Sequence, residues 1–144
     1  MENKDSYKKA EWKLYSYKEN IVKLKNLTQE IEREQNNNYN IRAMSYEERI
    51  TSTNLVSSAV EDEVIRRDEK LRRLQQEKSN IECDIKQVEN VLAILSEDDK
   101  KLIEERYFKK KTYLQLTQVF PYSTTGIANI TKRIIRKIEG LLVF

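Results

Sequence analysis

The residues best suited to chemistry lie near the C-terminal end, in the segment STTGIANITKRIIRK that starts at Ser123. Its candidate DNA-binding side chains are the hydroxyls, amide and cations of Ser123, Thr124, Thr125, Asn129, Lys132, Arg133, Arg136 and Lys137. Short hydroxyls and amides can hydrogen-bond to base edges, and asparagine can bond an adenine bidentately. Lysine and arginine bind phosphates. Because no acidic residue occurs in this segment, it predicts a surface that binds double-stranded DNA.

A helix over residues 124–142 would gather these side chains on one face. At about 100° per residue, five apolar residues fall within a narrow arc: Ile127, Ile130, Ile134, Ile138 and Leu141. The opposite side carries Thr125, Asn129, Lys132 and Arg136, flanked by Ala128 and Arg133. We expect the apolar face to pack on the protein and the polar face to enter a DNA groove. The alternative is an ordinary solvated surface on a small helical bundle.

The preceding residues predict a helix-turn-helix. Thr112 and Gln115 match the capping-box pattern, and Thr112 is also a candidate DNA-binding residue. A short helix would follow, with an apolar face made by Tyr113, Leu116, Val119 and Phe120. Pro121 disfavours helical geometry at Phe120 and should end that helix there, and Ser123 should cap the next helix. Two capped helices a few residues apart are the spacing of a helix-turn-helix.

A further helix is expected over the residues SEDDKKLIEERYF, which begin at Ser96. Ser96 with Asp99 fits a capping signature, and Glu97, Asp98 and Asp99 suit the positive end of a helix dipole. The same acidic residues could be interpreted as a metal site. No histidine and no second carboxylate cluster accompanies them, so the sequence favours the cap.

The rest of the chain predicts two long helices, over about 7–31 and 58–95, each with an apolar seam of three- and four-residue spacing. The asparagine-rich stretch after the first helix predicts a loop over about 36–58. The seams could pair within one chain as an antiparallel hairpin, between chains, or both. The expected fold is therefore all-α, with a long helical hairpin or coiled coil over 1–95 and a three-helix helix-turn-helix domain over 96–144.

Four aromatic residues cluster on the first helix: Tyr7, Trp12, Tyr15 and Tyr17. Aromatic side chains contribute much of the apolar area that cores bury. We expect these four to pack against the second long helix. The alternative is a partner-binding surface.

Composition and charge limit the function classes. There is no histidine, and Cys83 is the only cysteine, which removes the commonest acid–base group, an intrachain disulfide and a cysteine-rich zinc site. Since no Gly-rich phosphate loop or metal-spaced ligand set occurs either, we expect no enzyme, no cofactor and no metal. No apolar run reaches the roughly 18 residues of a membrane span, and no signal peptide is recognisable. A cytoplasmic location and no membrane partner are expected.

The net charge of +3 is unevenly distributed. Residues 100–144 carry 10 basic and 3 acidic side chains, whereas residues 61–99 carry 7 basic and 12 acidic ones. A basic final third on a nearly neutral chain indicates a polyanionic partner for that third.

The segment TYLQLTQVFPYSTTGIANITKRIIRKI resembles the helix-turn-helix of the fourth region of bacterial sigma factors, which recognises a promoter element. The preceding LSEDDKKLIEERYF resembles that region's lead-in helix, and with the long helices the whole chain looks like phage late transcription regulators of the ArpU/RinA group. The resemblance implies that Thr124, Thr125, Ala128 and Asn129 read the groove and that Arg133 faces phosphate. Sigma factors often carry charged residues at the first three of these positions, so a different DNA sequence should be read.

Two further departures concern the turn. Pro121-Tyr122 replaces a more usual turn, and Thr117 replaces a small residue at the tight contact between the two helices. That contact could be looser, or the Thr117 hydroxyl could bond back to the backbone.

The first functional hypothesis is a sequence-specific transcription regulator, an activator of phage or prophage genes, whose long helices dimerise or contact RNA polymerase. The second is an oligomeric phage DNA-packaging or assembly protein that joins a helix-turn-helix to a coiled coil. A coiled-coil adaptor without nucleic acid is a third, which the basic final third disfavours. An enzyme is the least favoured class.

Overall fold

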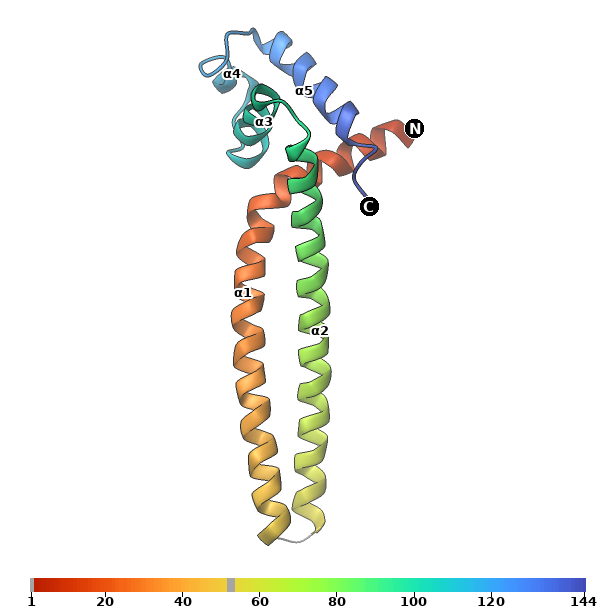
Figure 1. Ribbon diagram of the computed structural model, residues 1–144, viewed down its shortest axis with the longest axis vertical. Helices are drawn as coiled ribbons and strands as arrows, with labels where there is room; N and C mark the ends of the chain where they lie inside the picture. The colour runs from red at the N-terminus through yellow and green to blue at the C-terminus, as the bar shows by residue number, and fades with distance from the viewer. Residues whose placement is uncertain (1, 52–53) are drawn as a thin grey trace. The chain divides into compact units, whose positions relative to one another are not determined.

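A computed structural model of the protein describes residues 2–51 and 54–144 (Figure 1). Every regular element within these residues is helical, which confirms the all-α prediction. In chain order they are α1 (Glu2–Thr51), α2 (Asn54–Ala93), α3 (Glu97–Ile103), the π-helical turn η1 (Glu104–Phe108), α4 (Tyr113–Leu116) and α5 (Thr124–Ile138).

The two long helices are longer than expected, with 50 residues in α1 and 40 in α2. The loop expected over 36–58 is therefore wrong over 36–51 and 54–58, and residues 52 and 53 of that loop lie outside the described residues. No proline or glycine occurs before Pro121 to end either helix. Asparagine disfavours a helix by less than about 1 kcal/mol per residue, and packing against a neighbouring helix can outweigh that preference.

Contacts divide the chain into two compact units, and the division differs from the expected boundary between residues 95 and 96. The hairpin unit is Val22–Glu82. The terminal unit joins Met1–Ile21 to Cys83–Phe144. The beginning of α1 and the end of α2 therefore belong with the C-terminal helices.

In the hairpin unit, α1 and α2 run antiparallel and pair within one chain (Figure 1). Leu27 and Ile31 are buried there, and so is Glu34, which is only 4% exposed. The two carboxylate oxygens of Glu34 lie 3.2 Å from Nη1 of Arg67 and 3.1 Å from Nζ of Lys70. These ion pairs satisfy the buried carboxylate and cross from one helix to the other. They fix which residues of the two helices face each other.

The terminal unit has one core, to which each of its helices contributes. The buried residues are Ala10, Leu14, Val88, Val91, Leu92, Leu95, Leu102, Ile103, Tyr107, Leu116, Ile127, Ile134, Ile135, Ile138 and Leu142. The lead-in helix predicted from Ser96 onward is α3 followed by η1. In η1 the backbone N–H of Lys109 donates to the carbonyl of Glu104 over 3.0 Å, five residues back, which widens the helix by one residue.

Two predicted boundaries in the terminal unit are corrected. The helix expected to reach Phe120 ends at Leu116, because the chain tightens into turns in which Thr117 donates to Leu114 (3.2 Å) and Val119 to Leu116 (3.0 Å). The core position expected for Leu141 belongs to Leu142, since α5 ends at Ile138 and a turn follows. Leu141 is 54% exposed and Leu142 is 6% exposed.

The aromatic residues at the start of α1 pack mainly on η1. The rings of Tyr15 and Tyr107 meet edge to face with 4.8 Å between centroids, and those of Tyr17 and Phe108 lie 4.7 Å apart. Tyr7 is also partly buried against the core. Core packing is therefore confirmed for three of the four aromatics, with η1 rather than α2 supplying the ring partners. The exception is Trp12, which is 69% exposed.

Candidate nucleic-acid interface

Capping bonds form at all three predicted sites, before α3, α4 and α5. Ser96 Oγ accepts from the backbone N–H of Asp99 at 3.2 Å, which confirms the cap of α3. The N–H of Gln115 donates to Thr112 Oγ1 at 3.2 Å while Gln115 Oε1 accepts from the N–H of Thr112 at 2.9 Å, a complete capping box for α4. Ser123 Oγ accepts from the N–H of Gly126 at 3.1 Å and caps α5. These bonds fix where α4 and α5 begin.

Two outcomes were expected for Thr117 at the turn between α4 and α5: a looser contact, or a hydroxyl that bonds back to the backbone. The hydroxyl of Thr117 donates to the carbonyl of Leu114 over 2.5 Å. That back-bond to the backbone is the second of the two outcomes expected for Thr117. Leu116, one residue earlier, is fully buried in the core. The contact at the turn is therefore made by Leu116, and the hydroxyl of Thr117 is satisfied locally.

One side of α5 is anchored in the core. Its fully or nearly fully buried residues are Ile127, Thr131, Ile134, Ile135 and Ile138, and Ile130 is partly buried. Thr131 and Ile135 were not among the expected core residues. Thr131 tolerates burial because its hydroxyl donates to the carbonyl of Ile127 at 2.8 Å. Because a threonine hydroxyl in a helix can bond to the carbonyl four residues back, the sequence could have indicated that Thr131 tolerates burial.

The other side of α5 is exposed, and it holds most of the predicted site residues. Ser123, Thr124, Thr125, Asn129, Lys132 and Arg136 are exposed, while Ala128 is half-buried at the edge of this face. We name Thr125, Asn129, Lys132 and Arg136 the α5 polar face. Its cationic members have no acidic neighbour within ion-pair distance among the described residues, except that Nη1 of Arg136 lies 3.7 Å from Oε1 of Glu139.

Arg136 is held at the border of the α5 polar face. Its guanidinium carbon lies 5.6 Å from the centre of the Tyr7 ring, which belongs to α1. Burial and the neighbouring Glu11 carboxylate raise the pKa of the Tyr7 phenol to about 12. The positive charge of Arg136 acts in the opposite direction and lowers this pKa. Tyr7 is therefore neutral at physiological pH and offers Arg136 a ring face.

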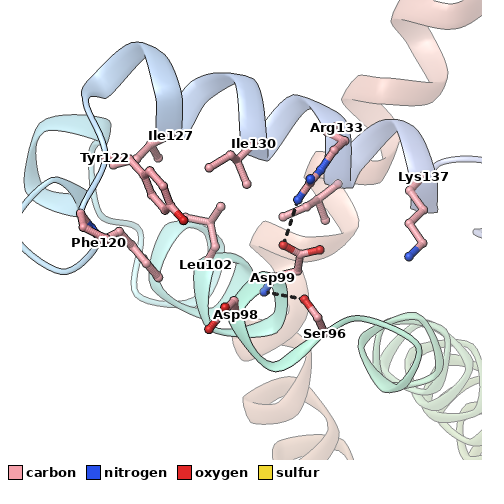
Figure 2. Close-up of a pocket in the computed structure, with 12 residues that line it drawn as sticks. Ser96, Asp98, Asp99, Leu102, Phe120, Tyr122, Ile127, Ile130, Arg133 and Lys137 are labelled. Carbon is pink, nitrogen blue, oxygen red and sulfur yellow. Dashed lines mark hydrogen bonds and ion pairs between the residues drawn. The ribbon is translucent and has the colours of Figure 1, made fainter.

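Arg133 and Lys137 lie on a different side of α5, along a groove of about 790 Å³ between α5, α3 and the turn (Figure 2). Its apolar lining includes Leu102, Phe120, Tyr122, Ile127, Ile130 and Ile134. Figure 2 shows the Arg133 side chain reaching across to α3, where its Nη2 lies 3.2 Å from Asp99 Oδ1. The structure thus separates Arg133 and Lys137 from the α5 polar face. Arg133 remains 68% exposed despite the ion pair.

Thr112 is exposed at the N-terminal end of α4, on a segment that charged contacts hold in place. Arg106 stacks over the ring of Tyr113 at 4.2 Å and donates from Nη1 to the carbonyl of Lys111 at 2.8 Å. The buried carboxylate of Glu105 pairs with Lys109 at 2.7 Å and also with Lys111. Hydrogen bonds from Lys109 and Lys111 hold the pKa of Glu105 below its usual value. These contacts fix the start of α4 relative to η1.

No family model, curated protein or solved structure gives a match to this chain. Within residues 2–51 and 54–144, no group of three or more acidic or cysteine side chains is placed to hold a metal ion. None of the helices described has a stretch both long and apolar enough to cross a lipid bilayer.

Proposed function

We propose that this protein is a sequence-specific DNA-binding transcription regulator, an activator of phage or prophage late genes. The observation that carries the DNA-binding proposal is the α5 polar face, where an amide, a hydroxyl and two cations are exposed. Glu139, 3.7 Å from Arg136, is the one acidic neighbour within ion-pair distance of this face among the described residues. The opposite side of the same helix is anchored by five buried residues. The phage and regulatory part of the proposal rests on the resemblance of residues 95–142 to sigma-factor and ArpU/RinA-type sequences.

In this proposal α5 enters the major groove. Its 15 residues give a rod of about 22 Å at 1.5 Å per residue, and the major groove, about 12 Å wide, admits a helix. Thr124, Thr125, Ala128 and Asn129 lie in the first two turns and contact base edges, with Asn129 suited to an adenine. Lys132 lies further along and binds phosphate.

Groups outside the base-reading turns position the protein on the duplex. Arg136 on α5 and Thr112 at the start of α4 bind the backbone beside the groove, and so does Lys137. Arg133 joins them once DNA competes with Asp99 for its guanidinium. The backbone N–H groups at the beginning of α5, next to Ser123, add donors for a phosphate. Such contacts set register and carry no sequence information.

The hairpin unit has the second role in the proposal: it dimerises or contacts RNA polymerase. It forms a compact unit of its own, and the α5 polar face lies in the other unit. DNA binding and partner binding can therefore use different parts of the chain. The protein would act in the cytoplasm.

The test is selection of bound duplexes from a random-sequence pool with the intact chain. The proposal expects a defined motif to be enriched and binding to weaken steeply as salt rises. The matched variant is Lys132→Gln, which should enrich the same motif with lower yield. Failure to enrich any motif, combined with large rings in light scattering, would favour a DNA-packaging or assembly protein instead.

A further inference from the structure

We propose that the DNA-binding surface continues from α5 onto the start of α1, where Lys4 and Lys8 bind phosphates of the same duplex. This inference rests on the proposed function and extends it to a helix outside the helix-turn-helix. The start of α1 lies in the terminal unit together with α5.

The contacts of Tyr7 place the start of α1 beside the α5 polar face. Its ring lies 5.6 Å from the guanidinium carbon of Arg136. Tyr113 of α4 and Arg106 of η1 are close enough to influence the charge of the same phenol. Figure 1 shows the first turns of α1, in red, passing the C-terminal half of α5, in blue. Tyr7 therefore lies beside α5, the helix expected to read DNA, and its phenol is within electrostatic reach of the first residue of α4.

Lys4, Lys8 and Trp12 follow one another at four-residue spacing and so form one ridge of α1. All three are exposed, and Trp12 keeps 69% of its surface accessible. Lys4 is one turn before Tyr7 and therefore lies next to it on the helix surface. A row of two cations and an exposed indole beside a cationic helix is complementary to a polyanion.

Two acidic residues, Asp5 and Glu11, lie near the ridge in the described part of α1. Neither Lys4 nor Lys8 has an acidic partner within ion-pair distance among the described residues. Glu11 accepts a hydrogen bond from the Tyr107 hydroxyl at 2.9 Å. Asp5 is exposed on an adjacent row and lowers the local charge without pairing with either lysine.

Other lysines on α1 lie in different surroundings from Lys4 and Lys8 and can therefore serve as controls for them. The ammonium groups of Lys9 and Lys13 lie 5.7 and 5.4 Å from the ring of Phe144. Lys13 also bonds Gln87 at 2.8 Å. Lys9 is thus one residue from Lys8 in the sequence but faces the C-terminal residues. Lys23 is exposed on α1 in the hairpin unit.

The first experiment compares the full chain with Lys4→Gln/Lys8→Gln and with the control Lys9→Gln/Lys23→Gln, which loses the same charge. The duplex carries the motif selected by the wild-type chain. Two lost phosphate contacts should reduce the slope of log affinity against log salt by about 1.8 and weaken binding about tenfold at physiological salt. The control should stay within about twofold. Glutamine and lysine have similar helix propensities, and circular dichroism checks that both variants remain folded.

The second experiment uses Trp12, the only tryptophan of the chain. Acrylamide is an uncharged quencher, so the charge of DNA does not change its local concentration. Saturating duplex should reduce acrylamide quenching of Trp12 fluorescence in the wild-type chain. Unchanged quenching, together with equal losses of affinity in both double variants, would overturn the extended surface while DNA binding itself stood. If the wild-type chain retained no duplex at any salt concentration, the proposed function and this inference would fail together.

Discussion

The hydroxyl of Tyr107 donates a 2.9 Å hydrogen bond to Oε2 of Glu11, which joins η1 to α1 across 96 residues of sequence. Tyr107 is fully buried, and Ala10 and Leu14 of α1 belong to the same core. The beginning of α1 is therefore a structural component of the unit that presents α5.

Tyr107→Phe should lower the free energy of unfolding by about 1 to 2 kcal/mol, because it removes a buried hydrogen bond to a charged group and keeps the ring. Urea denaturation monitored by circular dichroism measures the change. Tyr122→Phe is the matched control, since Tyr122 is 51% exposed, and it should change stability by less than about 0.5 kcal/mol. Equal effects of the two substitutions would show that the Tyr107–Glu11 bond has no special importance.

A fragment of residues 96–144 should not fold as the intact chain does. Without α1 and α2 it lacks Ala10, Leu14, Val88 and Leu92, and the core of its helices is exposed on that side. Amide chemical-shift dispersion and thermal unfolding of the fragment measure this. A cooperative transition and dispersed spectrum for the fragment alone would contradict the role assigned to α1.

Stability should fall in acid through two buried carboxylates. A hydrogen bond from Lys70 holds the pKa of Glu34 below its usual 4.5, and one from Lys109 does so for Glu105. A carboxyl whose pKa is lower in the folded state contributes stability above its unfolded pKa and loses it as pH falls through the folded pKa. Unfolding free energy should therefore be constant near neutrality and decline below about pH 4.5.

The control for this pH dependence lies in the hairpin unit. Glu34→Gln should reduce stability at neutral pH by about 1 to 3 kcal/mol and flatten part of the decline in acid. Glu32→Gln, at an exposed position of the same helix, should change neither. A decline of the same size in the Glu34 variant would mean that other groups cause the acid loss.

Ser123 offers a way to separate the stability of α5 from DNA binding. Ser123→Ala should cost about 1 kcal/mol in unfolding free energy because the cap of Gly126 N–H is lost. Ser123→Asp should keep the cap and the stability, since aspartate is an equally good cap, yet weaken DNA binding by placing a carboxylate near phosphates. Ser123→Asn keeps the cap without adding a charge and should leave DNA affinity nearly unchanged. Unaltered affinity for the Ser123→Asp variant would indicate that the start of α5 does not approach DNA.

The parts of the fold that depend on local chemistry could be predicted from the sequence. The caps at Ser96, Thr112 and Ser123 each involve a side chain and a backbone group three residues apart, so a short pattern is sufficient. The burial of Ile127 and Ile134 on one side of α5 follows from helical periodicity in the same way.

The parts of the fold that depend on contacts between distant residues could not be predicted from the sequence. The asparagines after Gln35 favour a turn by themselves, and the helix continues there because a second helix pairs with the first. The π-helical turn has no local signal; it is stabilised where Tyr107 enters the core and bonds Glu11. Trp12 was expected in the core with its aromatic neighbours, but it is 69% exposed.

In the candidate site too, features with a local sequence pattern could be predicted and features that depend on distant contacts could not. Helical periodicity predicted the exposed side of α5, including Asn129 and Lys132. It could not show that Arg133 turns to Asp99, because that ion pair joins α5 to α3 across 34 residues. The cationic ridge of Lys4 and Lys8 was missed because only the contact between Tyr7 and Arg136 brings it to α5.

The most direct test of the central claim compares Asn129→Ala with Lys132→Gln on two duplexes, one carrying the selected motif and one of random sequence. If α5 reads DNA, Asn129→Ala should lose about 1 to 3 kcal/mol on the motif and little on the random duplex, whereas Lys132→Gln should weaken both by the same factor. Fluorescence anisotropy of labelled duplexes at matched salt gives all of these affinities. If Asn129→Ala left the ratio of motif to random affinity unchanged, recognition by the exposed face of α5 would be contradicted.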